Sequence, residues 1–200
     1  MSVVIVDSGG ANIGSVRYAL ARLGVEAPLS RVGDEIRRAD LVLLPGVGSA
    51  AAAMERLRSA RLDTVIPALT QPVLGICLGL QLMFEHSEEG DTRCLGVLPG
   101  SARRIPQDQG LTVPHMGWNS VAKVGESQLL DGIGDDSYFY FVHSYAVPVV
   151  AATTGRCEYG SPFTAVAEHG NFFATQFHPE RSGGDGARLL ENFLRLGGDG

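Results

Sequence analysis

Cys77 stands in a segment where a cysteine can act as a nucleophile. It lies at the centre of Gly-Ile-Cys-Leu-Gly, residues 75–79, directly after a short apolar run. This order matches the nucleophile elbow, in which we expect the two glycines to let the chain turn sharply and hold the sulfur out at a strand end. A helix starting beside the sulfur would favour its thiolate form. The segment alone leaves open a buried structural cysteine.

A cysteine nucleophile needs a general base and a group that orients that base. Among the five histidines, His178 has the fitting context, because it follows the apolar run 172–177 and precedes Pro179 and Glu180. Proline biases the preceding residue toward extended backbone, and in an extended chain residues two apart point to the same side. We therefore expect Glu180 to orient the His178 ring, whose other nitrogen faces Cys77. A strand-end histidine without a catalytic role is the alternative.

The oxyanion that forms when a thiolate attacks a carbonyl needs hydrogen-bond donors. The amide of Leu78 follows the nucleophile and is expected at a helix start, where it has no partner within the helix. A second donor should come from a glycine-rich loop at a neighbouring strand end, and Gly46-Val47-Gly48 is such a loop. Either the Val47 or the Gly48 amide fits; an ordinary strand-to-helix turn is the alternative.

The elements that must position these residues alternate in the first half of the chain. Hydrophobic periodicity predicts strands at 3–7, 25–29, 41–44 and 73–76 and helices at 13–23, 34–39, 49–60, 62–69 and 78–86. Such alternation indicates a parallel sheet. Later strands are predicted at 95–105, 111–124, 138–149, 165–168 and 171–177, with a last helix at 185–196. We expect these strands to extend the same sheet in antiparallel fashion.

The predicted fold class is therefore α/β, with three layers, a mixed and mostly parallel sheet, flanking helices and antiparallel additions. The chain has 200 residues, of which 44% are hydrophobic, so a single domain over residues 1–200 can bury its own core. The net charge of −6 argues against a nucleic-acid or anionic-membrane partner.

Cysteine usage and the chain's apolar runs predict a cytoplasmic protein. Cys77, Cys94 and Cys157 form no C-x-x-C motif, which is typical of a reducing cytosol rather than of a disulfide framework or a structural zinc site. We see no signal peptide and no apolar run of the roughly 20 residues that a membrane span needs. We expect no metal and no cofactor, and we expect the acidic stretch 88–91 to be a solvated loop.

The motifs together carry a resemblance. Gly-Ile-Cys-Leu-Gly-Leu-Gln at 75–81 and Gln-Phe-His-Pro-Glu-Arg-Ser at 176–182 resemble the class I glutamine amidotransferases, which have a flavodoxin-like fold. Pro-His-Met-Gly-Trp-Asn at 114–119 narrows this, because it resembles the hallmark of the glutaminase subunits of imidazole glycerol phosphate synthases. The resemblance runs over essentially the whole chain.

The resemblance implies a reaction and a set of roles. Cys77 would attack the side-chain carboxamide of L-glutamine, with His178 and Glu180 completing a triad. The ammonia would pass to a separate cyclase subunit in a heterodimer, which would form imidazole glycerol phosphate and AICAR for histidine and purine metabolism. The residues that match substrate-holding positions are Gly46, Gln81, Ser144 and Tyr145. The residues expected at the subunit interface are His115, Met116, Gly117, Trp118, Asn119 and Arg181.

Trp118 is an aromatic residue, the type that often contributes much of the binding energy at a protein interface. The alternative is that Trp118 packs in the core. Two departures concern other parts of the family pattern. Ser8-Gly9-Gly10-Ala11 differs from the usual first loop, and Arg181 replaces a usual lysine, which keeps the charge but changes its geometry.

Three other functions remain as alternatives. The stretch 9–14 follows the first strand, as a dinucleotide-binding loop would, but it lacks the middle glycine of that motif. The chain could be a glutaminase for another acceptor, such as that of pyridoxal phosphate synthase, although the run at 114–119 argues against this. It could also be a regulatory subunit with little activity of its own.

Overall fold

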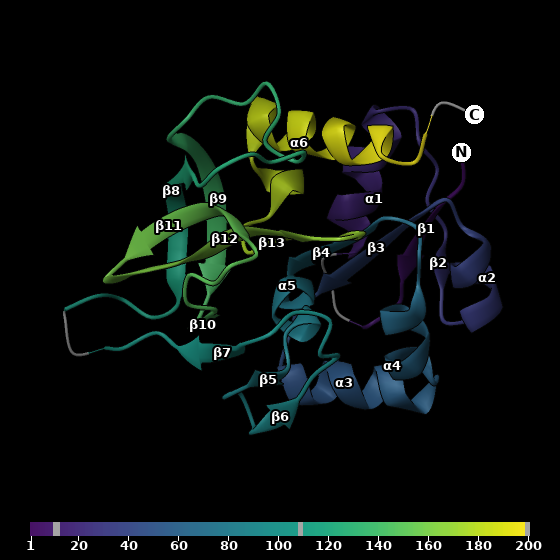
Figure 1. Cartoon of the computed structure of the whole chain (residues 1–200), viewed down its shortest axis with the longest axis horizontal. Helices are drawn as coiled ribbons and strands as arrows, with labels where there is room; N and C mark the ends of the chain where they lie inside the picture. The colour runs from purple at the N-terminus through teal and green to yellow at the C-terminus, as the bar shows by residue number, and fades with distance from the viewer. Residues whose placement is uncertain (10–12, 108–109, 199–200) are drawn as a thin grey trace.

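The computed structural model describes residues 1–9, 13–107 and 110–198 and has an α/β architecture (Figure 1). In this part of the chain, nine strands form one sheet in the order β2-β1-β3-β4-β13-β12-β11-β8-β9. The strands with parallel neighbours are β1 (Val3–Val6), β2 (Leu29–Ser30), β3 (Leu41–Gly46), β4 (Val73–Cys77) and β13 (Phe172–Thr175). The antiparallel strands are β12 (Ser161–His169), β11 (Thr153–Tyr159), β8 (His115–Lys123) and β9 (Ser137–His143).

Helices cover both faces of the parallel half, as Figure 1 shows. One face carries α1 (Ile13–Arg22) and α6 (Gly183–Arg195); the other side holds α2 (Gly33–Arg38), α3 (Ala50–Ser59), α4 (Leu62–Val65), η1 (Ile66–Ala68) and α5 (Leu78–Met83). Alternate strand residues feed two separate cores. Val3 and Ile5 belong to the core under α1 and α6, while Val4 and Val6 belong to the core under α3 and α5. Such two-sided burial explains why these strands are continuous apolar runs.

The predicted fold class is confirmed, including the antiparallel strands that extend the parallel sheet. A smaller sheet was not predicted. It has the order β10-β7-β5-β6, built from β10 (Tyr145–Ala146), β7 (Ser101–Arg104), β5 (His86–Ser87) and β6 (Thr92–Arg93). This smaller sheet lies beside helix α5 in Figure 1.

The expected strand at 95–105 is wrong over its first half, and so is the end of the helix at 78–86. Helix α5 ends at Met83, and the following segment closes that end. The amides of Leu95, Val97 and Leu98 donate to the carbonyls of Leu82 and Met83. Carbonyls at a helix end need such donors, so residues 95–98 cap α5 and only residues 101–104 pair as a strand.

Three further elements differ from the expectations. The strand expected at 25–29 begins only at Leu29, because Pro28 has no N–H to donate to a ladder. The run 138–149 divides into β9 and β10. Strand β11 was missed, because its buried positions alternate correctly but carry small or polar residues, Thr153, Gly155 and Cys157.

Two sequence expectations can be compared only with the part of the chain that the structure describes. Half of the segment 9–14 that resembles a dinucleotide-binding loop, residues 10–12, lies outside the described residues. Among the helices that the structure describes, none is long and apolar enough to cross a membrane.

Candidate active site

The candidate site forms where three parallel strands end side by side. Strand β4 carries Cys77 as its last residue and lies between β3 and β13. Gly46 at the end of β3 pairs with Cys77, and Thr175 at the end of β13 pairs with Ile76. The carboxyl ends of parallel strands meet at one edge of a sheet, which is the usual place for a site in such folds. The topology therefore brings the loop 46–48 and the segment after Thr175 to either side of the cysteine.

The turn at Cys77 is tight for a reason that differs from the expected one. Cys77 itself has a positive φ of 56° with ψ −107°, a conformation that is costly for a residue with a side chain. The neighbouring glycines are needed for close approach. A Cβ on Gly79 would lie 1.8 Å from the Leu44 carbonyl oxygen, and one on Gly75 would lie 2.8 Å from the Gly79 backbone. The glycines thus let α5 sit directly against β3 and β4.

Cys77, His178 and Glu180 come together as predicted from the sequence. The His178 ring Nδ1 lies 2.8 Å from Glu180 Oε1, and the His178 side chain also hydrogen-bonds that of Cys77. Burial favours the neutral ring, but the hydrogen bonds and charges of Cys77 and Glu180 outweigh it and raise the pKa of His178 to about 10. The ring is therefore placed between the sulfur and a carboxylate, as a general base must be.

The route by which Glu180 reaches the ring was predicted incompletely. His178 is extended, with φ −98° and ψ 96°, but Pro179–Arg181 forms a short 3-10 helix, η2. The chain therefore turns directly after the histidine and folds the carboxylate back onto the ring. The Ser182 hydroxyl donates to the His178 carbonyl at 2.7 Å, and the His178 amide donates to Tyr140 O at 2.9 Å. These bonds hold the turn against β9.

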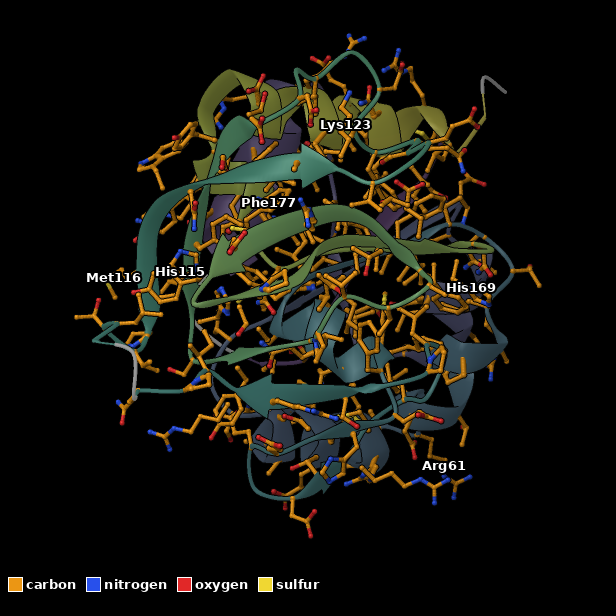
Figure 2. All side chains as sticks on the ribbon, turned by 60° about the vertical axis from the view of Figure 1, so that its left-hand side comes forward. Arg61, His115, Met116, Lys123, His169 and Phe177 are labelled. Carbon is orange, nitrogen blue, oxygen red and sulfur yellow. The ribbon has the colours of Figure 1, made fainter. Side chains whose placement is uncertain are left out.

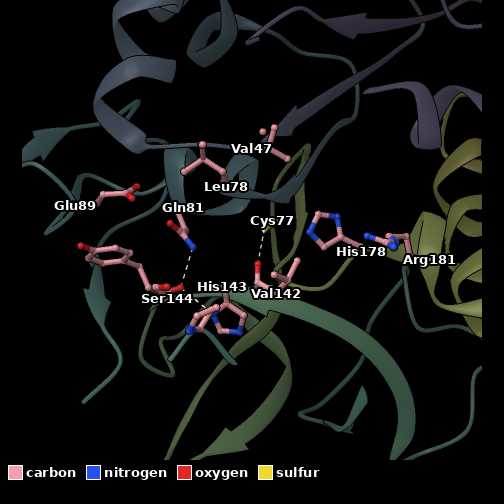
Figure 3. Close-up of a pocket in the computed structure, with 14 residues that line it drawn as sticks. Val47, Cys77, Leu78, Gln81, Glu89, Val142, His143, Ser144, His178 and Arg181 are labelled. Carbon is pink, nitrogen blue, oxygen red and sulfur yellow. Dashed lines mark hydrogen bonds between the residues drawn. The ribbon is translucent and has the colours of Figure 1, made fainter. Parts of the chain in front are cut away.

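A pocket of about 540 Å³ opens over the sulfur (Figure 3). It holds Cys77 and His178 and all of the predicted oxyanion and substrate residues, namely Gly46, Val47, Gly48, Leu78, Gln81, Ser144 and Tyr145. In Figure 3, Cys77 lies between Gln81 on one side and His178 on the other. Arg181, which we expected at a subunit interface, also lines the pocket.

The candidate oxyanion donors lie around the nucleophile. Leu78 is the first residue of α5, so its amide has no acceptor within the helix. Across the strand pair, Gly46 is in register with Cys77, and Gly48 has a φ of 93°. A Cβ on Gly46 would lie 2.9 Å from the Leu78 Cβ. Glycine at this position therefore allows the loop to approach the helix start.

Glu89 is a pocket residue that the sequence analysis missed. We expected the acidic stretch 88–91 to be a solvated loop, but Glu89 is half-buried and lines the pocket. Its carboxylate accepts a hydrogen bond of 2.7 Å from the Ala50 amide at the start of α3, which Ser49 also caps through its bond from Ala52 N. The sequence held no periodic signal for this contact, because it joins residues 39 apart.

Two buried polar residues near the sulfur were also missed. Gln176 is fully buried, and its Nε2 donates to Cys77 Sγ at 3.8 Å. His143 is 5% exposed and lines the pocket. The sequence did contain a signal for Gln176. It is a polar residue directly after a buried apolar strand and two residues before His178.

His143 belongs to a second histidine cluster, formed with His115 and Tyr145. His115 Nδ1 lies 3.0 Å from His143 Nε2, and His143 Nδ1 lies 2.9 Å from the Tyr145 carbonyl oxygen. The His115 ring stacks on Phe141 and Tyr159. Burial lowers the pKa of His115 to about 4 and that of His143 to about 3. Both rings are therefore neutral at pH 7.

The residues expected at a subunit interface divide into an exposed and a buried set. Met116 and Trp118 are 63% and 55% exposed, so the alternative of a core aromatic is wrong for Trp118. Met116 lies at the outer edge of the molecule in Figure 2, beside His115. His115 is only 3% exposed and supports the strand from within. Gly117 and Asn119 are half-buried, and the Asn119 Nδ2 donates to Glu158 O at 3.0 Å.

Known proteins define the class to which this fold and site belong. The family model described as "Glutamine amidotransferase class-I" matches residues 4–196, and the chain is a member of that class. A crystal structure of a glutamine amidotransferase has the same fold, with a TM-score of 0.77 and 19% identity over 100% of both chains. PurLQS from Thermotoga maritima gives a TM-score of 0.72 and 17% identity, covering 98% of this chain and 99% of that one.

Closer relatives narrow the family. The imidazole glycerol phosphate synthase subunit HisH of Xanthomonas euvesicatoria is 53% identical over 194 residues, 97% of each chain. The HisH subunit of Salmonella typhimurium is 52% identical over 198 residues, 98% of this chain and 100% of that one. The chain therefore belongs to the HisH family within the class I glutamine amidotransferases.

Proposed function

We propose that this chain is the glutaminase subunit of an imidazole glycerol phosphate synthase. It hydrolyses L-glutamine to glutamate and ammonia and supplies the ammonia to a cyclase subunit in histidine biosynthesis. The lyase activity belongs to the complex of the two subunits. The observation that carries the proposal is the contact of His178 with both Cys77 and Glu180 at the floor of a pocket, in a chain of the HisH family.

The proposed chemistry follows from the roles of the three residues. The proton of the Cys77 thiol is held by His178, as the raised pKa of that ring favours, and the Cys77 sulfur attacks the carboxamide carbon of glutamine as a thiolate. The amides of Leu78 and of the Val47–Gly48 loop stabilise the oxyanion of the tetrahedral intermediate. Its collapse breaks the C–N bond, and His178 donates a proton to the departing ammonia. A water molecule, deprotonated by His178, then hydrolyses the γ-glutamyl thioester to glutamate and regenerates the thiol.

The pocket also suits the charged end of an amino acid. Glu89 lies on one side of it and Arg181 on the other, as Figure 3 shows. Of these two residues, Glu89 has a carboxylate that can attract the ammonium group of an amino acid, while Arg181 lies on the far side of Cys77 and His178. Gln81 adds a neutral polar group between Glu89 and Arg181. We propose that Glu89 and Gln81, with Gly46, Ser144 and Tyr145, hold the substrate.

The outer face of β8 and β9 is the proposed docking surface for the cyclase subunit. Met116, Trp118 and Tyr138 are each more than half exposed, where an antiparallel sheet facing water would carry polar residues. Arg181 lies 4.9 Å over the Tyr140 ring at the edge of this patch. An exposed aromatic patch with an arginine has the composition of a protein interface. The buried thiols of Cys94 and Cys157, neither in a disulfide, suit a reducing cytoplasm, where we place the complex.

The test measures glutamate release by the purified chain mixed with its cognate cyclase subunit and that subunit's ribonucleotide substrate. Cys77→Ala should abolish the activity, while Cys94→Ala, which removes a buried thiol outside the pocket, should keep it. Full activity of Cys77→Ala would overturn the assignment of the nucleophile. Capture of a different acceptor enzyme from lysate, with no binding to the cyclase, would overturn the choice of partner while leaving the glutaminase chemistry intact.

A further inference from the structure

The Gln176 carboxamide has no role in the reaction described above, yet it lies against the reacting sulfur. It is fully buried directly after β13, and its Nε2 is 3.8 Å from Cys77 Sγ. Burying a carboxamide is costly unless its polar atoms have partners. An apolar residue would extend the apolar strand Phe172–Thr175 at less cost, so the choice of glutamine needs an explanation.

The orientation of this carboxamide follows from its neighbours. The Tyr145 carbonyl oxygen can only accept hydrogen bonds, and it lies 2.9 Å from the Gln81 side-chain nitrogen. Gln81 must therefore turn its NH₂ group inward, and its second N–H reaches Gln176 Oε1 at 3.1 Å. This contact fixes the oxygen of Gln176 on the side of Gln81, which leaves the NH₂ group of Gln176 facing the sulfur.

The backbone carbonyl at the origin of this chain is itself held. His143 Nδ1 lies 2.9 Å from Tyr145 O, and since a carbonyl accepts, Nδ1 carries the proton. His143 Nε2 then accepts from His115 Nδ1 at 3.0 Å. The carbonyl accepts from both His143 and Gln81, so the histidine pair holds it in place, and its acceptor-only character sets the direction of the Gln81 bond. The resulting order of donors ends with an N–H group that points to Cys77.

A donor at this place acts on the charge of the sulfur. Besides the His178 ring, the Val142 carbonyl oxygen lies near the sulfur, 3.8 Å from Sγ, where it accepts from the thiol and disfavours a negative sulfur. An N–H group has the opposite effect, because a hydrogen bond to the charged form stabilises that form. Gln176 therefore opposes the carbonyl from the buried side of the sulfur.

We propose that Gln176 is a further catalytic residue, whose carboxamide donates a hydrogen bond to the Cys77 sulfur and stabilises its thiolate. Its oxygen also keeps Gln81 in place, so one side chain connects the nucleophile to the substrate-holding glutamine. The inference rests on the proposed role of Cys77 as the nucleophile.

The test is the pH dependence of Cys77 alkylation by iodoacetamide in the full chain without glutamine or partner. Gln176→Met keeps the length of the side chain and removes the donor. We expect the midpoint of its alkylation profile to rise by about one pH unit, which means roughly tenfold slower alkylation at pH 7. Alkylation of Cys77→Ala gives the background from the two buried thiols.

A second variant separates the two roles of Gln176. Gln176→Glu keeps an oxygen that accepts from Gln81 but replaces the NH₂ group, and its carboxylate opposes a thiolate. We expect the same upward shift of the midpoint and a lower kcat with little change in KM, whereas Gln176→Met should also raise KM. Each variant is first compared with the wild type in its secondary-structure content and its urea unfolding midpoint. Either variant that matches the wild type in both is sufficient for the test.

Thr175→Val is the matched control. Thr175 is fully buried at the end of the same strand, and its hydroxyl donates to Phe177 O rather than to the site. We expect it to lose stability but to keep the wild-type alkylation profile. Wild-type profiles in the folded Gln176 variants would overturn the proposal, as would an equal shift in Thr175→Val. Neither result would touch the glutaminase proposal, which fails only if Cys77→Ala stays active.

Discussion

His178 and His143 both line the pocket and both are almost fully buried, 3% and 5% exposed, yet their pKa values move in opposite directions. Burial disfavours the charged form of each ring. His178 has the carboxylate of Glu180 at 2.8 Å and Cys77 on its other side, which together outweigh that penalty. His143 has a second imidazole and a backbone carbonyl, which do not.

The difference teaches that burial alone does not decide what a histidine does. A buried ring with a carboxylate partner keeps the proton that it takes from the nucleophile and can later donate it to the leaving group. A buried ring with neutral partners stays neutral near pH 7 and serves as a rigid hydrogen-bonding element. One histidine of the pocket thus serves proton transfer, and the other holds its neighbours in position.

The strongest test of this contrast removes the base. His178→Asn should lower kcat of the glutaminase reaction by roughly 10³-fold, because general acid–base groups contribute about 10²–10⁴-fold. The measurement is glutamate release in the presence of the cyclase subunit. His169→Asn, an exposed position in the hairpin between β12 and β13 that Figure 2 labels, is the control and should behave as wild type. A modest loss in His178→Asn would move the base elsewhere.

Removal of the Glu180 carboxylate should make His178 more like His143, whose ring has no carboxylate partner. In Glu180→Gln the pKa of the ring should fall from its raised value, and kcat should drop by roughly 10²-fold. The ring is followed by NMR titration and the rate by glutamate release. Asp91→Asn is a matched control, since His86 and Asp91 make a pair at the same 2.8 Å on the surface. If Glu180→Gln and Asp91→Asn gave the same His178 pKa and the same kcat, the Glu180 carboxylate would not be what distinguishes His178 from His143.

The outer face of the strand that bears His115 should matter for binding rather than for proton transfer. Trp118→Ala should weaken the complex with the cyclase subunit by about 30-fold, corresponding to a loss of about 2 kcal/mol for an interface aromatic. Isothermal titration calorimetry measures the affinity. Tyr18→Ala removes an aromatic side chain that is 74% exposed on α1 and should have no effect. Equal affinities for the two variants would place the interface elsewhere.

The neutral state of His115 and His143 should also affect how the free energy of unfolding depends on pH. His143 and His115 bind protons in the unfolded chain below pH 6.5, but in the folded chain only below about 3 and 4. The free energy of unfolding should therefore fall as the pH drops from 6.5 toward 4. The contribution of His178 has the opposite sign: it is fully present below pH 6.5 and is lost as the pH rises through about 10.

His143→Gln keeps a donor and an acceptor without a titratable ring. Its stability should fall less steeply with acid than that of the wild type, by about 1.4 kcal/mol per pH unit for one proton. Urea unfolding between pH 4 and 6.5 measures both slopes, and ionisable groups common to both proteins cancel in the comparison. Identical slopes would mean that His143 is charged in the folded protein.

The accuracy of sequence prediction differed between the two halves of the sheet. In the parallel half, β1, β3 and β4 are apolar runs buried on both faces, and the elements from β1 to α5 were predicted within a few residues apart from β2 and the end of α5. In the antiparallel half, β11 has buried positions such as Gly155 and Cys157, which give little hydrophobic contrast. Residues 95–98 looked like a strand because they are apolar, but their amides close α5.

Local sequence by itself determined the elbow at Cys77, the glycine-rich loop after β3 and the adjacency of His178 and Glu180, because each depends on residues within five positions of one another. Tertiary structure decided the rest. The neutral state of His143, the inward turn of Glu89 and the N–H of Gln176 facing the sulfur arise from contacts between residues 28 to 99 apart. Periodicity and motif spacing carry no information on such pairs, since hydrogen bonds and burial depend on which strands lie together.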